Sequence, residues 1–344
     1  MRHDFLTKYQ HVPVIEYDNT VAGQAIVSVC VQTYQQSETI RKCLDSILEQ
    51  NTSFTFEILL AEDQSIDGTR DICLSYAKKY PNKIRLFLHS RENNIEIDGR
   101  PSGRFNYVYN LLNARGKYIA FCEGDDYWND PQKLNKQVEF LENASDYALV
   151  HTDNIILNVN NNTRTISRKS DKYISDEIFR QLLNKNHIST VTVLVRRDIV
   201  LEACEALYKS FGVEMIMDYS LWLYVSKNAK IKHMPDITAT YCLSINSASR
   251  PDNKDQQYQY IKKVFDIKIH YCSLSDCNDK FIKRLELNYL RKKLYYAFLN
   301  MDTETAKKSI QKIKQINGYL SLRDRMKYLG SKYKILNNLL NKMD

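Results

Sequence analysis

The sequence lacks the features that mark membrane-spanning and secreted proteins. No run of about 18 apolar residues occurs, so no transmembrane helix is expected. Residues 1–24 mix Arg2, His3, Asp4, Glu16 and Asp18 with short apolar pieces, which is not the pattern of a secretion signal. We therefore expect the protein in the cytoplasm.

It also lacks the common motifs of metal and nucleotide sites. The eight cysteines fall mostly in apolar runs and show no CxxC or CxxH spacing, so we expect reduced thiols in the core. None of the nine glycines forms GxG or GxxxxGK, which excludes the motifs of a dinucleotide-binding turn and of a P-loop. No Ser-His-Asp or zinc-ligand spacing involves the seven histidines. A phosphate ligand would have to be met by a metal ion and basic side chains.

Positive charge is concentrated in the last quarter of the chain. Residues 251–344 contain 20 Lys and Arg against 10 Asp and Glu, so the net charge of +8 for all 344 residues leaves −2 for residues 1–250. The basic residues of this region stand in short clusters such as Arg291-Lys292-Lys293. Such clusters predict an anionic partner, either lipid headgroups or nucleic acid. Because Leu, Ile and Tyr interrupt them at helical spacing, solvated faces of packed helices are the alternative.

Apolar runs and amphipathic segments alternate in the first half of the chain. This alternation predicts a mainly parallel, doubly wound α/β sheet with its ligands outside the carboxyl ends of the strands. Ser37 is expected to cap the first crossover helix, and Pro131 to open a later one. The expected strands are residues 26–32, 56–61, 84–88 and 118–122, and the helices between them are residues 37–48, 69–80 and 104–114, the last after a polar loop at 89–103.

The later elements are less regular. We expect strands at residues 147–151 and 189–196, an Asn-rich turn at 158–162 and a helix at 218–227. From about residue 255 helix follows helix. The predicted organisation is an N-terminal extension (1–23), an α/β domain (24–250) and a basic helical region (251–344).

Acidic residues follow two of the expected strands directly. Glu123-Gly124-Asp125-Asp126 places carboxylates where they could share one hard divalent cation, although a Gly-Asp-Asp turn can also be only a turn. Asp63 could accept a hydrogen bond from a base or ribose, or could simply favour the following helix dipole.

Three segments together carry a resemblance to a known family. Residues 27–34, 43–50 and 62–69 resemble the opening of family 2 glycosyltransferases, and residues 114–128 resemble that family's A-x-G-x-Y-I-x-x-x-D-x-D-D block, with Glu123 replacing the first Asp. The resemblance covers roughly residues 24–250. It implies a GT-A fold, a nucleotide-diphospho-sugar donor, Mn²⁺ or Mg²⁺, and transfer with inversion at the anomeric carbon.

The resemblance also implies roles for residues on the donor side. Asp63 would contact the base, which favours a UDP-sugar although thymine offers the same imide N–H, and Thr33 and Glu38 would lie nearby. Arg104 would face the nucleotide or its diphosphate.

Asp125 would bind the metal, while Glu123 and Asp126 would bind the nucleotide or complete the metal shell. Residues 217–223 resemble the family's E/D-D-x-x-L-W-L element, which makes Asp218 the expected general base, although it could also cap the helix that begins there. Two positions depart from the family pattern: Glu123, and Ser244, which replaces the His of a Tyr-Arg-x-His element.

The leading hypothesis is an inverting glycosyltransferase that adds a sugar to a glycan or lipid-linked oligosaccharide in surface polysaccharide synthesis. The basic helices would hold it at the inner face of the cell membrane. One alternative is an inactive module that binds sugar nucleotide or a partner. A second alternative is nucleic-acid binding through the basic tail, which would depend steeply on salt. The alternation of Tyr and Lys in this tail fits core packing equally well, so no nucleic-acid partner is expected.

Overall fold

The computed structural model describes residues 1–97, 99–167, 177–243 and 253–341. The chain divides into two compact units, Met1–Ser244 and Ile245–Asp344. The predicted boundary at 250/251 and the departure at Ser244 lie outside the described residues. The predicted domain limits and the predicted effect of Ser244 therefore stay predictions.

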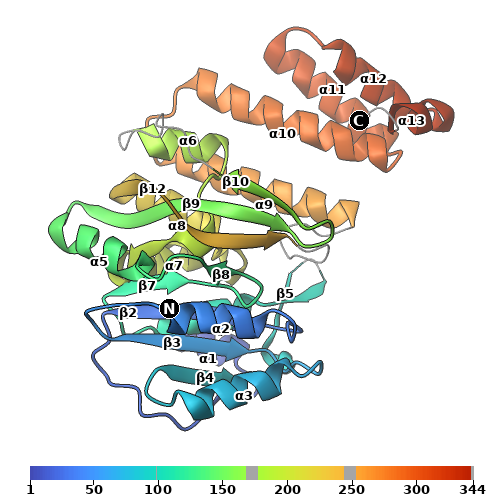
Figure 1. The fold of residues 1–344 in the computed structure, drawn as a ribbon. Coiled ribbons are helices and arrows are strands. Elements are labelled where there is room, and N and C mark those ends of the chain that lie inside the picture. Colours follow the sequence, from blue (N-terminus) through green and yellow to red (C-terminus); the bar gives the residue numbers. More distant parts are fainter. Residues whose placement is uncertain (98, 168–176, 244–252, 342–344) are drawn as a thin grey trace. The chain divides into compact units, whose positions relative to one another are not determined.

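The first unit is built on one sheet of mixed direction (Figure 1), in the order β1-β4-β3-β2-β7-β11-β9-β12-β8, with β10 beside β9. The pairs β4-β3, β3-β2, β2-β7 and β9-β12 are parallel, whereas β11 runs antiparallel to β7 and β9. The strands are β1 (Ile15–Glu16), β2 (Val27–Thr33), β3 (Phe56–Glu62), β4 (Ile84–Leu88), β7 (Tyr118–Phe121), β8 (Tyr127–Trp128), β9 (Tyr147–Asn158), β10 (Thr163–Ser167), β11 (Leu194–Arg196) and β12 (Lys230–Leu243). The α/β class predicted from the sequence is confirmed.

Helices cover both faces of this sheet, which is why its central strands are apolar on both sides. Alternate residues of β2 and β3, such as Val29 and Ile58, pack in one cluster with Leu44 of α2. On the other face Phe105 of α4 stacks on Phe5 of α1 at a centroid distance of 5.2 Å. The helices are α1 (Arg2–Tyr9), α2 (Ile40–Leu48), α3 (Thr69–Lys79), α4 (Arg104–Asn113), α5 (Lys133–Asn143), α6 (Ile178–Asn184), α7 (Arg197–Phe211) and α8 (Asp218–Asn228).

The structure corrects several local predictions. Helix α2 begins at Ile40 after Thr39, so Ser37 is not its cap; the Ser37 backbone N–H instead donates to Asp67 Oδ2 at 3.0 Å. Within the expected strand at 189–196, residues Thr190–Thr192 form the 3₁₀ turn η3, and only β11 (Leu194–Arg196) pairs in the sheet. The polar loop at 89–103 holds the 3₁₀ turn η1 (Arg91–Asn93) and the short hairpin β5 (Ile95–Ile97) with β6 (Arg100–Ser102).

The second unit is helical, as predicted. Leu294 and Phe298 of α10 are fully buried, and Leu294 packs in a small core with Ala306 and Ile313 of α11. Among the described residues, no helix combines the length and apolar character needed to cross a bilayer. The helices are α9 (Lys254–Ser273), α10 (Asp279–Leu299), α11 (Thr303–Asn317), α12 (Leu322–Gly330) and α13 (Lys334–Asn341).

Candidate functional site

The loops that follow β2 and β3 are locked together at the carboxyl ends of these strands. Gln35 and Gln64 both have positive φ angles, 53° and 59°, a conformation that side chains other than glycine rarely adopt. Polar contacts hold each one: Gln35 Oε1 accepts from the Asp67 backbone N–H at 3.1 Å, and Gln64 Oε1 accepts from the Arg91 N–H at 2.8 Å. A strained backbone of this kind is kept only where the surrounding contacts hold it in place, as these polar contacts do.

The acidic loop after β7 packs directly on the β2 loop through a glycine. The Gly124 N–H donates to Gln32 O at 3.0 Å, and Thr39 Oγ1 donates to Gly124 O at 2.9 Å. A Cβ at Gly124 would lie 2.3 Å from Gln36 Oε1 and 2.8 Å from Thr33 Oγ1. Any side chain at position 124 would therefore displace the Thr33 and Gln36 side chains of the β2 loop.

Asp63 is held by one oxygen and leaves the other available. It is 3% exposed, and its Oδ2 accepts from Arg91 Nη1 at 2.9 Å and from Asn94 Nδ2 at 3.0 Å. Its Oδ1 is buried and accepts no hydrogen bond from the described residues. Burial raises the pKa of Asp63, while Asn94, Arg91 and the nearby side chain of Asn106 act against that rise. A buried oxygen without a donor is costly, so this geometry suits an N–H donor of a ligand.

An aromatic ring flanks this position. The Arg91 guanidinium lies 3.9 Å from the ring centroid of Tyr34, whose side chain is 40% exposed. Thr33, predicted to lie near the nucleotide, is buried and donates through Oγ1 to Gln36 Oε1 at 2.8 Å, so it shapes the loop. Glu38 is exposed and has no hydrogen bond or ion pair within the part of the chain that the structure describes.

The three acids after β7 occupy different environments. Asp126 is 3% exposed and accepts the Cys242 N–H of β12 through Oδ1 at 2.8 Å, which ties the loop to the sheet. Burial, followed by the charges of Asp125 and Glu123, raises the pKa of Asp126 well above its ordinary value. Asp126 Oδ1 thus holds the acidic loop on β12, and the predicted role of Asp126 toward the nucleotide stays a prediction.

Glu123 and Asp125 remain partly open to solvent. Packing of protein atoms around the Glu123 carboxylate, with the charges of Asp125 and Asp218, raises the pKa of Glu123 to about 8, and Arg104 opposes this rise. More than a third of Glu123 is nevertheless exposed, so water offsets part of the effect. Burial also raises the pKa of Asp125.

The predicted base, Asp218, begins α8 and is part of this same electrostatic cluster. Met217, not Asp218, is the N-cap residue. Asp218 Oδ2 accepts from Thr190 Oγ1 at 2.6 Å, and its Oδ1 accepts from the Tyr219 N–H at 2.6 Å. Thr190 belongs to η3, so the turn that replaced the expected strand positions this carboxylate.

Arg104 and Tyr107, one turn apart on α4, complete the described site. An Arg104 Nη1 donates to Ile216 O just before α8, and its guanidinium lies 5.9 Å from the Tyr107 ring centroid. Burial, then the charge of Asp218, raises the pKa of Tyr107 well above its ordinary value. The Tyr107 hydroxyl is buried and makes no hydrogen bond to the described residues.

The structure thus brings Arg104, Glu123, Asp125 and Asp218 into one cluster, with Asp63 on the neighbouring strand end. Sequence reasoning missed several supporting residues: Tyr34, Arg91, Asn94, Tyr107 and Thr190. Only the Thr33-Tyr34 sequence at a strand end offered a signal for one of them.

Within the described ranges, no group of three or more His, Cys, Asp or Glu side chains is placed to hold a metal ion. A Mg²⁺-type site needs fewer protein ligands, because one or two carboxylates, water and substrate phosphates complete its shell. Glu123 and Asp125 are the carboxylates predicted for this role, and their metal binding stays a prediction.

Comparison with known proteins gives a consistent family. The sequence profile described as "Glycosyl transferase family 2" matches residues 28–203. An uncharacterized protein of Mycobacterium tuberculosis is 43% identical over 118 residues, which is 34% of this chain and 31% of that protein. The chain thus matches about a third of the length of these relatives.

Other similarities extend over more of the chain. A Bacillus subtilis protein provisionally named teichuronic acid biosynthesis glycosyltransferase TuaG is 26% identical over 275 residues, covering 76% of this chain and 98% of that one. The structure of S. aureus TarS residues 1–349 with UDP-GlcNAc aligns with a TM-score of 0.58 and 17% identity, over 92% of each chain. At this identity the structural match establishes the fold, and the predicted GT-A fold is confirmed.

Proposed function

The chain belongs to glycosyl transferase family 2, and from that premise we propose that it transfers a sugar from a UDP-sugar to a glycan or lipid-linked hydroxyl in surface polysaccharide synthesis. The name of the B. subtilis relative and that of a Bacillus spizizenii poly(ribitol-phosphate) beta-glucosyltransferase, 31% identical over 36% of this chain and 18% of that one, support such an acceptor. The TarS complex with UDP-GlcNAc supports a uridine nucleotide.

The buried Oδ1 of Asp63, unbonded among the described residues, is the observation that supports the donor assignment. This oxygen needs a hydrogen-bond donor, and the imide N–H of uracil supplies one, as does that of thymine. Arg91 and Asn94 fix Oδ2, so Oδ1 is presented in one orientation. The partly exposed ring of Tyr34 offers a surface on which the base can stack.

Asp218 is proposed as the general base. Its carboxylate takes the proton of the acceptor hydroxyl as that oxygen bonds to the anomeric carbon, and the bond to the diphosphate oxygen breaks on the opposite face, which inverts the configuration. Thr190 holds Asp218 Oδ2 at 2.6 Å and so restricts the carboxylate to one orientation. Arg104, beside Glu123, would meet the negative charge of the diphosphate.

The carboxylates of Asp125 and Glu123 fit a hard divalent cation, Mn²⁺ or Mg²⁺. They are oxygen donors, and burial together with repulsion from Asp125 raises the pKa of Glu123; a bound cation would relieve that repulsion. Such a cation would supply charge stabilisation for the departing diphosphate. We keep Asp126 outside this set because its Oδ1 is already bonded to β12.

Titration calorimetry with UDP, GDP and dTDP, each with Mn²⁺ and with EDTA, tests the donor site. We expect UDP to bind with metal dependence and Asp63→Ala to weaken binding about tenfold or more, because a buried polar partner is lost. Asp71→Ala is the matched control, since Asp71 is exposed on α3. Absence of binding by all three nucleotides would refute the assignment.

A second measurement separates an enzyme from an inactive binding module. Asp218→Asn should abolish metal-dependent release of UDP from a UDP-sugar while leaving UDP binding unchanged. If wild-type protein binds UDP and UDP-sugars but never releases UDP from them, the binding module becomes the better description.

We further propose that the protein acts at the cytoplasmic face of the membrane. Five Lys and Arg and only one acid, Asp324, occur in residues 319–341. Asp324 is 5% exposed and caps α12, so it does little to offset this charge. Exposed Tyr333, Ile335 and Leu339 lie in the same segment, a combination suited to an anionic bilayer surface.

A further inference from the structure

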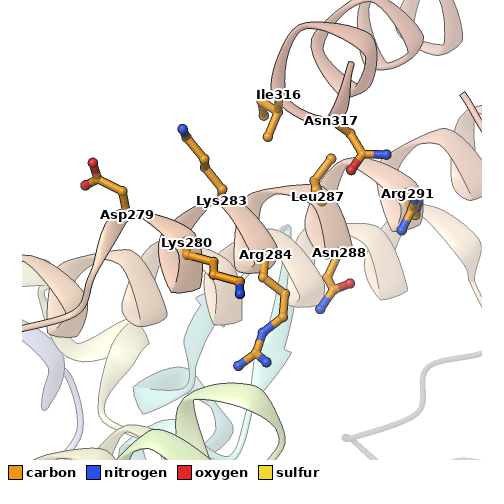
Figure 2. A pocket seen from close by; sticks show the side chains of 9 residues that line it. All are labelled: Asp279, Lys280, Lys283, Arg284, Leu287, Asn288, Arg291, Ile316 and Asn317. Atoms are coloured by element: carbon orange, nitrogen blue, oxygen red, sulfur yellow. The ribbon is translucent and has the colours of Figure 1, made fainter. Parts of the chain in front are cut away.

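Helix α10 carries a pocket that no part of the proposed reaction uses (Figure 2). It lies between α10 and the carboxyl end of α11 and has a volume of about 500 Å³. Four of its lining side chains are cationic: Lys280, Lys283, Arg284 and Arg291. One acid, Asp279, is present at its edge.

Two of the four cations, Lys280 and Lys283, have no ion-pair partner in the part of the chain that the structure describes. Both side chains are exposed. Arg291 is 3.5 Å from Asp324, which lies on α12 outside the pocket lining. The pocket therefore retains a positive field that an anionic ligand would stabilise.

The charges are spaced for more than one anion. Lys280 and Arg291 are separated by 11 residues of one helix, which is about 16 Å at the rise of an α-helix. A single phosphate cannot contact both ends, whereas a chain with repeating negative groups can. The amides of Asn288 and Asn317, between and beside the cations, can bond to sugar hydroxyls.

The lining argues against two other anionic partners. Leu287 and Ile316, its apolar residues, are half-buried between the helices, whereas a bilayer contact needs protruding apolar side chains. The described lining contains no aromatic ring on which the bases of a single-stranded nucleic acid could stack.

We propose that this pocket binds an acidic glycan chain with repeating phosphate or carboxylate groups, and so retains the acceptor polymer on the enzyme. The inference rests on the proposed function, because it names the chemistry of the acceptor. The pocket itself performs no chemistry, and its role is to hold the polymer between successive transfers.

The test uses the full-length protein and fluorescence anisotropy. The probes are a labelled oligogalacturonate for carboxylate, a labelled inorganic polyphosphate for phosphate, and a neutral maltooligosaccharide. We expect at least one acidic chain to bind, with affinity falling as salt rises, and the neutral chain not to bind. The acidic probe that binds more tightly identifies the repeating group.

Two double variants locate the site. Lys280→Gln/Lys283→Gln should weaken the acidic chain about fivefold to tenfold, since two uncompensated cations are lost. Lys307→Gln/Lys308→Gln removes the same charge from exposed positions of α11 outside the lining and should have little effect. Matched circular dichroism and melting temperatures confirm that both variants are folded.

Three outcomes would overturn the proposal: no acidic chain binds, both double variants lose affinity equally, or the pocket variant loses only binding to anionic vesicles or oligothymidine. UDP affinity is measured on the same preparations. If UDP binding persists while acidic chains fail, this inference alone fails. If acidic chains bind at the pocket but no nucleotide binds, the proposed function fails instead.

Discussion

At the scale of single residues, the site depends on carboxylates that neighbouring donors hold in place. Asp63 uses Oδ2 for Arg91 and Asn94, whereas Asp218 uses Oδ2 for Thr190 and Oδ1 for the Tyr219 N–H. Each arrangement fixes the rotamer of the acid before substrate arrives, which reduces the reorganisation needed during reaction. The residues that do the fixing are neutral or basic, and are as important to the geometry as the acids themselves.

Thr190 provides the clearest test of this arrangement. Thr190→Val keeps the shape of the side chain but removes the hydroxyl that donates to Asp218 at 2.6 Å. Because a hydrogen bond to a charged group is worth about 1.5–3 kcal/mol, we expect kcat to fall roughly tenfold to a hundredfold with little change in KM for the donor.

Thr190→Ser is the matched control, since it restores a hydroxyl at the same position, and it should recover most of the activity. Steady-state kinetics and melting curves for both variants decide the matter. A Val variant as active as the wild type would remove Thr190 from the mechanism.

At the scale of elements, the site is an interlocking of loops at the ends of strands β2, β3 and β7. Gly124 shows how tight this is. Gly124→Ala would place a Cβ 2.3 Å from Gln36 Oε1 and 2.8 Å from Thr33 Oγ1, so these two side chains, which are bonded to each other, must shift. We expect a loss of about 1–3 kcal/mol in the free energy of unfolding and at least tenfold weaker UDP binding.

Gly23→Ala is the control for that change, because nothing lies within 4 Å of a Cβ at Gly23. Urea denaturation and calorimetry measure the two effects. Unchanged nucleotide affinity in Gly124→Ala would mean that the two loops act independently.

Helix α5 contains a buried lysine whose titration should affect stability. Lys133 is fully buried, donates to Gln137 Oε1 at 2.8 Å and lies 4.5 Å from the Trp128 ring centroid. Burial lowers the pKa of Lys133 to about 7. Between that pH and its ordinary pKa of 10.5 the unfolded chain binds more protons, so this residue makes the protein more stable as pH rises.

Lys133→Met should therefore remove a slope on the order of 1 kcal/mol per pH unit between pH 7 and 10. The cost of losing the bond to Gln137 hardly varies with pH, so the slope is the quantity to compare. Lys136→Met, on the exposed side of α5, should leave the slope unchanged in this range because carboxylates raise the pKa of Lys136. Parallel stability curves for Lys133→Met and wild type would show that Lys133 does not titrate as described.

The sequence predicted the elements whose apolar period is strong and missed those shaped by distant contacts. The buried runs of β2 and β3 were placed within one residue. By contrast, residues 190–192 are as β-branched as a strand but form a turn, because Thr190 bonds to Asp218, 28 residues away. The Arg91 and Asn94 contacts to Asp63 likewise cross about 30 residues of sequence, and no local pattern encodes them.

The same limit applies to the candidate site. Asp63, Asp125 and Asp218 were predicted because motif and position agree, and their roles stay predictions. Burial and bonding could not be predicted: Glu38 is exposed without a described partner, and Asp126 Oδ1 is bonded to β12. Neighbouring acids in one motif can differ in burial. Asp126 is buried because β12, more than a hundred residues later in the chain, pairs with β8 and bonds to the Asp126 carboxylate.

At the scale of the whole molecule, charge is divided between the two units. Residues 1–250 carry a net charge of −2 and contain the acidic donor site, whereas residues 251–344 carry +10. The excess of basic residues in residues 251–344 favours anionic surfaces and polymers as partners of the second unit.

The exposed apolar residues near the chain end make the membrane part of this division testable. Ile335 and Leu339, 79% and 58% exposed, lie one turn apart on α13, so they can enter an interface together. We expect the full-length protein to sediment with vesicles rich in phosphatidylglycerol but not with pure phosphatidylcholine, and Ile335→Asn/Leu339→Asn to weaken that binding about tenfold or more. Val159→Asn/Ile166→Asn, which changes 45% and 51% exposed side chains in the first unit, should not weaken it. Equal effects of the two double variants, or binding that ignores lipid charge, would show that the second unit does not dock on the membrane. UDP binding should remain unchanged in both variants, because none of these residues belongs to the predicted donor site.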